Sequence, residues 1–296
     1  MDDTKSNPRA PGRVTFLDGQ NEMPMVEITT AWSTAAIYLH GAHVTEFKKK
    51  GEPPLLFMSQ VSRFGEGQPI RGGIPVIFPW FGPREGMAQH GFARVKAWEL
   101  KEFAPAADGS VSVRFRLPEY PEASAFPPFM AEYTVTVNRF LTLELAVTNQ
   151  SREEAFVFEN CLHTYFEIGD INRVSITGLK GVTYQDKVAN FASKVEEKDA
   201  IRIGSEVDRI YLNTTGPVEI LDAAQRRRIR VEKHGSLSTV VWNPWIAKAG
   251  QMPDFGDDEY KRMVCVESGN VGSDNIKLPP GETSRLTVKI GSEPLS

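Results

Sequence analysis

Residues 133–147 read Tyr133-Thr-Val-Thr-Val-Asn-Arg-Phe-Leu-Thr-Leu-Glu-Leu-Ala-Val147, and apolar residues alternate with mostly polar ones on both sides of Asn138-Arg139. A period of two is typical of half-buried strands, because successive side chains of a strand point to opposite faces of its sheet. The pattern restarts after Asn138-Arg139, so we predict an antiparallel hairpin with a short turn at that place.

The same alternation recurs along most of the chain. It follows the turn signal Asp108-Gly109 and is found again at residues 111–117, 218–221, 229–231, 237–242, 263–267 and 286–290. No helical pattern persists for ten residues, and only residues 196–200 and 257–262 are expected to form single helical turns. The pattern therefore predicts an all-β fold of antiparallel sheets packed as a sandwich. We expect a disordered tail at residues 1–12 and a single domain at residues 13–296, because no composition break marks a linker.

Composition and charge exclude several classes of protein. The 296 residues are 41% hydrophobic and 24% charged, which is ordinary for a globular chain. A formal net charge of −4 argues against a nucleic-acid partner, which would require a basic surface. No apolar run is long enough to span a membrane, and the polar first twelve residues predict no secretory signal. With only two cysteines, Cys161 and Cys265, we expect reduced thiols in a cytoplasmic monomer.

A loop between Arg71 and Arg94 combines cationic, aromatic and proline residues. Its prolines exclude a helix and a long central strand, because proline lacks a backbone donor. Arg71, Arg84 and Arg94 bracket the apolar segment, and a buried guanidinium requires an anion or a carboxylate beside it. We therefore predict a rigid, largely buried loop that forms an anion site with an apolar wall.

Two further segments carry residues suited to proton transfer. Residues 156–166 form a strand candidate that is apolar at both parities and contains His163, and Glu267 ends a second apolar strand. An isolated interior histidine is most often structural, but its usual pKa also suits proton transfer near neutral pH. By alternation, Cys161 shares a face with His163 and Cys265 shares a face with Glu267. If both strands face one cleft, they supply it with one acid and one base.

Other prominent residues have simpler interpretations. The pair His40-x-x-His43 has no further ligand set nearby, so we expect no metal site. The basic run at residues 225–230 is expected to be a solvated strand edge or hairpin, where charges oppose aggregation. The tryptophans of the arginine loop and of residues 241–245 are expected to be core residues. A role as platforms for sugar stacking is the less favoured interpretation.

Taken together, six motifs resemble the glucose-6-phosphate 1-epimerases, the hexose-6-phosphate mutarotases of the aldose 1-epimerase superfamily. The motifs are Arg71-Gly-Gly-Ile-Pro-Val-Ile-Phe-Pro-Trp-Phe-Gly82, Gln89-His-Gly-Phe-Ala-Arg94, Glu159-Asn-Cys-Leu-His-Thr-Tyr-Phe166, Glu206-Val-Asp-Arg-Ile-Tyr211, Val241-Trp-Asn-Pro-Trp245 and Cys265-Val-Glu-Ser-Gly269. The resemblance implies a galactose mutarotase-like antiparallel β-supersandwich. It also implies interconversion of the α and β anomers of glucose 6-phosphate, a small-molecule substrate, without a metal or organic cofactor.

The resemblance also assigns roles to individual residues. His163 matches the general acid of the family and Glu267 its general base, while the matched substrate-binding positions are Arg71, Gln89, Arg94 and Asp208. It assigns no role to Arg84 and leaves open whether His90 contacts the sugar.

Two alternatives remain, an aldose 1-epimerase of unphosphorylated sugars and a non-catalytic carbohydrate-binding β-sandwich. Arg71 and Arg94 argue against the first, and the pairing of an acid with a base argues against the second. A disulfide between Cys161 and Cys265 is a further open possibility.

Overall fold

The hairpin expected at residues 133–147 is confirmed in the computed structural model, which describes residues 12–295 of the chain. Strand β8 (Phe129–Val137) pairs antiparallel with β9 (Leu141–Asn149), so that Val137 lies opposite Leu141 and Tyr133 lies opposite Leu145. The alternating apolar side chains of both strands are fully buried, whereas the threonines between them are partly exposed.

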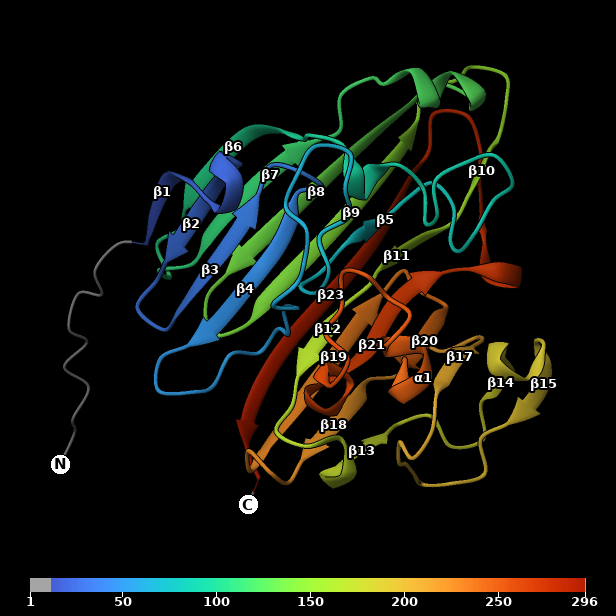
Figure 1. Ribbon diagram of the computed structural model, residues 1–296. Coiled ribbons are helices and arrows are strands. Elements are labelled where there is room, and N and C mark those ends of the chain that lie inside the picture. The colour runs from blue at the N-terminus through green and yellow to red at the C-terminus, as the bar shows by residue number, and fades with distance from the viewer. Residues whose placement is uncertain (1–11, 296) are drawn as a thin grey trace, which may run out of the picture.

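This hairpin lies inside a nine-stranded antiparallel sheet (Figure 1). In spatial order the strands are β16 (Ala200–Ile201), β13 (Val174–Thr177), β18 (Val218–Asp222), β19 (Arg227–His234), β23 (Thr283–Pro294), β9, β8, β7 (Val111–Arg116) and β6 (Glu99–Pro105). The twelve-residue strand β23 pairs with β19 on one side and β9 on the other, and thereby joins the two halves of the sheet.

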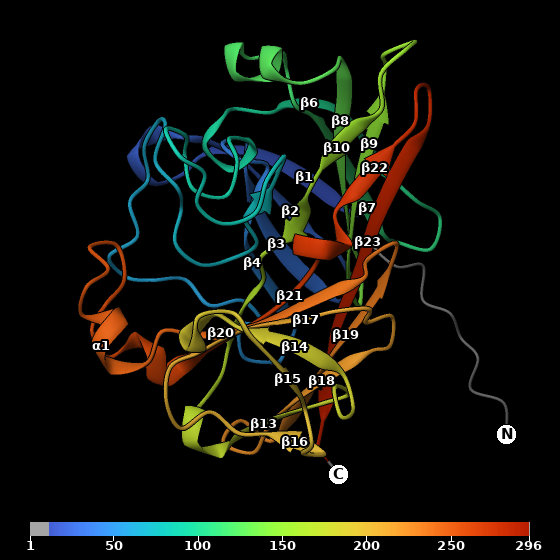
Figure 2. The same cartoon turned by 90° about the vertical axis from the view of Figure 1, so that its right-hand side faces the viewer.

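Two further sheets share a core with this one (Figure 2). The four-stranded sheet contains β1 (Arg13–Asp18), β2 (Pro24–Thr29), β3 (Ser33–Tyr38) and β4 (His43–Lys49). The eight-stranded sheet contains β15 (Ala192–Val195), β14 (Thr183–Asp186), β17 (Val207–Tyr211), β20 (Ser238–Asn243), β21 (Met263–Asn270), β11 (Asn160–Leu162) and β5 (Val76–Ile77), with β12 (Tyr165–Glu167) also paired to β21. A separate pair is formed by β10 (Phe156–Phe158) and β22 (Ile276–Leu278).

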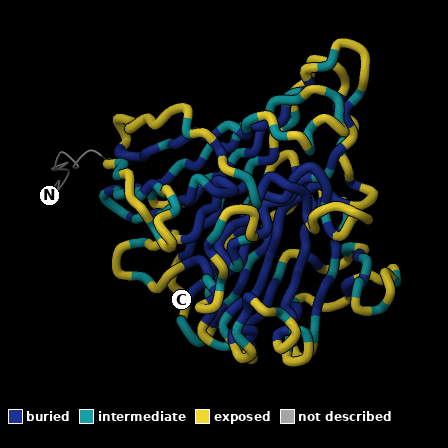
Figure 3. The backbone as a smooth tube through the Cα atoms, turned by 45° about the horizontal axis from the view of Figure 1, so that its top comes forward, coloured by how far each residue is buried: buried dark blue, intermediate teal, exposed yellow. Residues whose placement is uncertain are grey.

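One continuous cluster of buried apolar side chains contacts all three large sheets. It includes Ile37 from the four-stranded sheet, Leu143 from the nine-stranded sheet and Val266 from the eight-stranded sheet. Burial is concentrated in the central strands, and exposure in the edge strands and in many of the connecting loops (Figure 3). The antiparallel β-supersandwich expected from the sequence is therefore confirmed. Most of the expected tail, residues 1–11, lies outside the described residues, and the division into a tail and one domain stays a prediction.

Helices are short throughout the described part of the chain. The α-helix α1 (Trp245–Ala249) is accompanied by 3₁₀ helices η1 (Gln20–Glu22), η2 (Ala93–Val95), η3 (Pro121–Ala125), η4 (Ile171–Arg173), η5 (Lys187–Ala189), η6 (Glu259–Arg262) and η7 (Gly272–Asp274). Helix η6 confirms the turn expected at residues 257–262. The turn expected at residues 196–200 is wrong, because the Glu196 carboxylate accepts hydrogen bonds from Arg209 and Tyr211 of β17 and the backbone there is not helical. Within residues 12–295, no helix has the length and apolar character needed to cross a membrane.

The prediction of one strand at residues 156–166 is also wrong, because this segment is divided among β10, β11 and β12. The break falls at Glu159, whose carboxylate accepts backbone hydrogen bonds from Phe81 and Gly272. Strand β10 pairs with β22, whereas β11 and β12 pair with β21. Successive residues of β11 and β12 are buried at both parities, because both faces of the eight-stranded sheet are covered there.

The basic run at residues 225–230 belongs to the hairpin of β18 and β19, as one of the two interpretations expected, but it is not a strand edge, because β19 lies between β18 and β23. Arg228 and Arg230 do form surface ion pairs with Glu219. Arg227, in contrast, is 3% exposed and donates to the backbone carbonyls of Pro53, Pro54 and Glu167. It is a buried structural cation.

The strand register excludes the disulfide between the two cysteines. Cys161 lies opposite Gly269 on β21, whereas Cys265 is four residues further along that strand and lies opposite Tyr165. Four strand residues span roughly 13 Å, which exceeds the Cα separation that a disulfide can bridge. Both cysteines are free and buried.

Tyr133 carries a buried polar group without a partner among the described residues. The Tyr133 side chain is fully buried, and its hydroxyl has no hydrogen-bond partner among the described residues.

Because an unsatisfied buried hydroxyl is destabilising, we expect Tyr133→Phe to raise the free energy of unfolding by about 1 kcal/mol in chemical denaturation. The control is Tyr211→Phe, which removes a hydrogen bond to Glu196 and should destabilise the protein. Destabilisation by Tyr133→Phe would contradict the prediction.

Candidate active site

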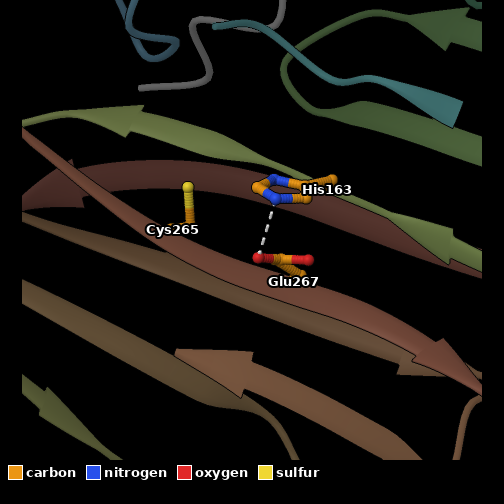
Figure 4. Close-up of side chains that lie close together, drawn as sticks. All are labelled: His163, Cys265 and Glu267. Atoms are coloured by element: carbon orange, nitrogen blue, oxygen red, sulfur yellow. Dashed lines mark ion pairs between the residues drawn. The ribbon is translucent and has the colours of Figure 1, made fainter. Parts of the chain in front are cut away.

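The central pair of the site follows from the register of β21 with its neighbours. Cys161 of β11 lies opposite Gly269, and Tyr165 of β12 lies opposite Cys265. The same register places His163, in the short gap between β11 and β12, opposite Glu267. The His163 Nε2 and Glu267 Oε1 atoms are 3.2 Å apart (Figure 4). The expectation that the two side chains share one cleft is therefore confirmed.

Two more strands extend the same face of the sheet. On β20, Val240 lies opposite Glu267 and Trp242 lies opposite Cys265. On β17, Asp208 lies opposite Trp242. A pocket of about 190 Å³ opens above this face. Its lining residues are Arg71, Phe81, Gln89, His90, Arg94, His163, Tyr165, Lys187, Asp208, Val240, Trp242, Lys248, Met252 and Glu267.

All of the site residues expected from the sequence line this pocket, namely His163, Glu267, Arg71, Gln89, Arg94 and Asp208. They come from the arginine loop, the gap between β11 and β12, β17 and β21, so distant segments of the chain meet here. The other candidates lie elsewhere. Arg84 packs over the rings of Trp80 and Phe126, and neither it nor the basic run at residues 225–230 lines the pocket.

The arginine loop is largely buried, as expected, and contains only the two-residue strand β5 and the short helix η2. Gly91 has a φ of +72°, and a Cβ atom there would lie 2.0 Å from the Phe78 carbonyl oxygen. This close approach requires glycine and positions Gln89 and His90 beside the pocket.

His90, which the sequence left unassigned, presents a defined tautomer to the pocket. Its Nδ1 atom accepts a hydrogen bond from the backbone N–H of Gly82, so Nε2 carries the proton of the neutral ring. Burial lowers the pKa of His90 well below its usual value, and Arg94 adds to this effect. His90 is therefore a neutral donor 5.7 Å from the His163 ring, measured between ring centroids.

Arg71 is held by two neighbours and is already paired. Its guanidinium donates to both carboxylate oxygens of Asp254 at 3.2 Å and to the Tyr165 hydroxyl at 2.9 Å. Although burial alone would lower the pKa of Arg71, Tyr165 and Asp254 raise it. The Tyr165 ring in turn stacks on His163 with centroids 4.8 Å apart. Arg71 thus fixes one wall of the site.

Arg94 differs from the other cations of the pocket. Lys187 lies 2.8 Å from Asp208, and Lys248 lies 3.1 Å from Glu206. Arg94 is 9% exposed and donates to the Gln89 carbonyl oxygen, but none of the described carboxylates forms an ion pair with it. Burial lowers its pKa to about 10, and Arg71 adds to this effect. Arg94 is thus a buried cation that faces the pocket without a counter-ion in the described part of the chain.

Burial also dominates the electrostatics of His163 and Glu267. It raises the pKa of Glu267 well above its usual value, with a further contribution from the Asp208 carboxylate. It lowers the pKa of His163 well below its usual value, and Arg94 and Arg71 add to this effect. The His163 Nδ1 atom has no hydrogen-bond partner among the described residues, so proton exchange involves Nε2. The pair is therefore arranged to share one proton between Nε2 and a carboxylate oxygen.

The side chains around His163 and Glu267 are poorly suited to bind a metal ion. Among residues 12–295, His163, Cys265 and Glu267 form the one cluster of three candidate metal ligands. Metal ligands must lose their protons, whereas burial raises the pKa of both Cys265 and Glu267. The other candidates, His40 and His43, contact the backbone carbonyl oxygens of Gln68 and Gly72.

Sequence reasoning missed several residues of the pocket. Tyr165 was visible only as a residue of an apolar strand candidate, and Trp242 was expected to be a core residue in preference to a sugar-stacking platform. Lys187 and Lys248 carried no motif that set them apart. Tyr165 could have been found from the alternation that starts at Cys161 and passes through His163. Lys187 could not, because helix η5 reaches the site only through the pairing of β14 with β17.

The fold is that of a sugar mutarotase, and the chain belongs to the aldose 1-epimerase family. The sequence profile of that family, described as "Aldose 1-epimerase", matches residues 24–291. A Cenchrus ciliaris protein named "Putative glucose-6-phosphate 1-epimerase" is 36% identical over 273 residues, covering 88% of this chain and 82% of that protein. An Escherichia coli (strain K12) protein of the same name is 36% identical over 272 residues, covering 91% and 90%.

A solved structure agrees with this assignment. The crystal structure of YeaD from Salmonella typhimurium, described as a "putative mutarotase", has a TM-score of 0.85 and 30% identity to this chain. The match covers 95% of this chain and 97% of that one. The galactose mutarotase-like fold is thereby confirmed.

We expect Glu267→Gln to slow the exchange of sugar anomers by about 10²–10⁴-fold, since the amide cannot accept a proton. Saturation-transfer NMR on hexoses and their 6-phosphates measures this exchange. The matched control is Glu259→Gln, because Glu259 is also a buried glutamate but lies outside the pocket. Undiminished exchange in a folded Glu267→Gln protein would show that Glu267 is not the base.

Proposed function

We propose that this protein interconverts the α and β anomers of glucose 6-phosphate and of related hexose 6-phosphates. The observation that carries the proposal is the unpaired Arg94 guanidinium in the pocket that holds His163 and Glu267. A buried guanidinium is costly without an anion, and the phosphate dianion matches its donors in charge and geometry. A neutral sugar would leave Arg94 uncompensated, which argues against the free-sugar alternative.

The chemistry needs one proton acceptor and one proton donor close together. The anomeric hydroxyl loses its proton to Glu267 while the ring oxygen gains one from His163 Nε2, and the C1–O5 bond breaks to give the open-chain aldehyde. Rotation about C1–C2 exposes the other carbonyl face. The C5 hydroxyl then attacks C1, with His163 as the base and Glu267 as the acid. Each positioned group contributes about 10²–10⁴-fold, and no covalent intermediate is needed.

The remaining residues orient the sugar. Arg94 is the main phosphate ligand in this proposal. Asp254 and Tyr165 hold the Arg71 guanidinium in place as a second cation of the pocket. Asp208, Gln89 and the Nε2–H of His90 are available to the ring hydroxyls. The paired acid and base argue against a purely sugar-binding module, since binding alone needs neither.

The phosphate also affects the proton balance of the site. Burial and the arginines lower the pKa of His163. A bound phosphate dianion offsets the positive potential of Arg94 and Arg71, and so raises the pKa of His163 toward the protonated state that donates to the ring oxygen. Binding of the phosphorylated substrate thereby favours the protonated form of His163, which is the acid of the reaction.

We keep the expectations of a cytoplasmic location and a monomeric state as part of the proposal. The two free cysteines support the location, because oxidising compartments favour disulfides. Analytical ultracentrifugation tests the oligomeric state.

Arg94→Ala should raise the KM for glucose 6-phosphate about 10–100-fold, because charged hydrogen bonds contribute about 1.5–3 kcal/mol each. Glucose should be affected much less. Arg84→Ala is the control, since that guanidinium packs on aromatic rings outside the pocket. Equal losses for both sugars in coupled anomerisation assays would refute the phosphate role of Arg94.

The pH profile should depend on the phosphate. Activity requires a proton on the pair, so the basic limb of kcat marks the loss of that proton. Because phosphate raises the pKa of His163, this limb should lie at higher pH for glucose 6-phosphate than for glucose. Profiles of kcat against pH for the two sugars measure the difference, and a basic limb at the same pH for both would contradict this effect.

A further inference from the structure

The base is held by an unusual hydrogen-bond donor. Glu267 is 1% exposed, and its Oε2 atom accepts a hydrogen bond from Cys161 Sγ at 3.5 Å. Its Oε1 atom faces His163 Nε2 but has no other partner among the described residues. The carboxylate is therefore oriented by a thiol and an imidazole.

Other buried carboxylates of this chain have stronger donors. Asp222 accepts hydrogen bonds from the backbone N–H groups of Gly169, Ala224 and Gln225. Asp254 accepts from the Arg71 guanidinium. Backbone N–H groups and guanidinium groups are strong donors to a carboxylate, whereas a thiol is only a weak donor.

The fold holds the Cys161 side chain in this position. Cys161 is fully buried in an apolar cluster with Ile77, Ile210, Val240 and Val271. On β21 it lies opposite Gly269, where a Cβ atom would approach Cys161 Cβ to 2.8 Å. Glycine thus leaves room for Cys161 beside Glu267. Burial and the Glu267 carboxylate raise the pKa of the Cys161 thiol, which keeps its proton available for donation.

We propose that Cys161 is a positioning residue for Glu267, which it orients through a weaker hydrogen bond than a hydroxyl would form. This inference rests on the proposed function. A hydroxyl at the same position would be a stronger donor and would stabilise the charged carboxylate. Loss of the donor would leave Oε2 free to rotate away from the sugar. Replacing the Cys161 thiol with a hydroxyl and removing the donor altogether therefore have different consequences.

Cys161→Ser and Cys161→Ala separate these consequences. In Cys161→Ser we expect the acidic limb of kcat, where Glu267 must be deprotonated, to move down by about one pH unit. In Cys161→Ala we expect kcat to fall about tenfold with little change in KM, because the carboxylate loses its orientation. Ile210→Val is the control, since it removes a methylene from the same apolar cluster and should leave the pH profile unchanged.

A second measurement does not depend on the substrate. The Glu267 carboxyl titration, followed by ¹³C NMR and assigned with Glu267→Gln, should also move down by about one unit in Cys161→Ser. An unchanged titration in folded Cys161→Ser would overturn the positioning role. If wild-type protein anomerises no hexose 6-phosphate, the proposed function fails instead, while the carboxyl titration still decides the role of Cys161.

Discussion

The site depends on the register of one strand, β21. Its antiparallel pairing with β11 and β12 places Cys161, His163 and Tyr165 in a row opposite Gly269, Glu267 and Cys265. A shift of one residue would turn Glu267 away from the pocket, because adjacent side chains lie on opposite faces. The 3.2 Å contact between His163 and Glu267 is thus a consequence of backbone pairing. His163 lies in the break between β11 and β12, and its imidazole therefore lines the pocket.

Charge in the pocket is organised around one uncompensated cation. The chain as a whole has a formal net charge of −4, yet arginine and lysine side chains surround the acid–base pair. Arg71, Lys187 and Lys248 are each neutralised by a carboxylate. Arg94 has no such partner among the described residues, so its electrostatic potential acts on His163 until an anion arrives. Binding and proton transfer are coupled through this potential.

Predictions from the sequence succeeded where the signal was local and failed where it depended on distant contacts. Alternation revealed the hairpin of β8 and β9 because each strand shows one face to the core. It failed at residues 156–166, where Glu159 redirects the chain between two sheets. Likewise, nothing local distinguishes the buried Arg227 from its exposed neighbours, since its acceptors are carbonyl groups at least 60 residues away.

By itself, the sequence determined the all-β class, the rigid arginine loop and the chemical types at the site, because period, proline content and residue chemistry are local properties. Its motifs also identified six of the fourteen pocket residues through their resemblance to a family. Only the tertiary structure decided which arginine lacks a counter-ion, how His90 is protonated and which atom orients Glu267. Those properties arise from side chains far apart in the chain, and their positions are set by strand register and packing.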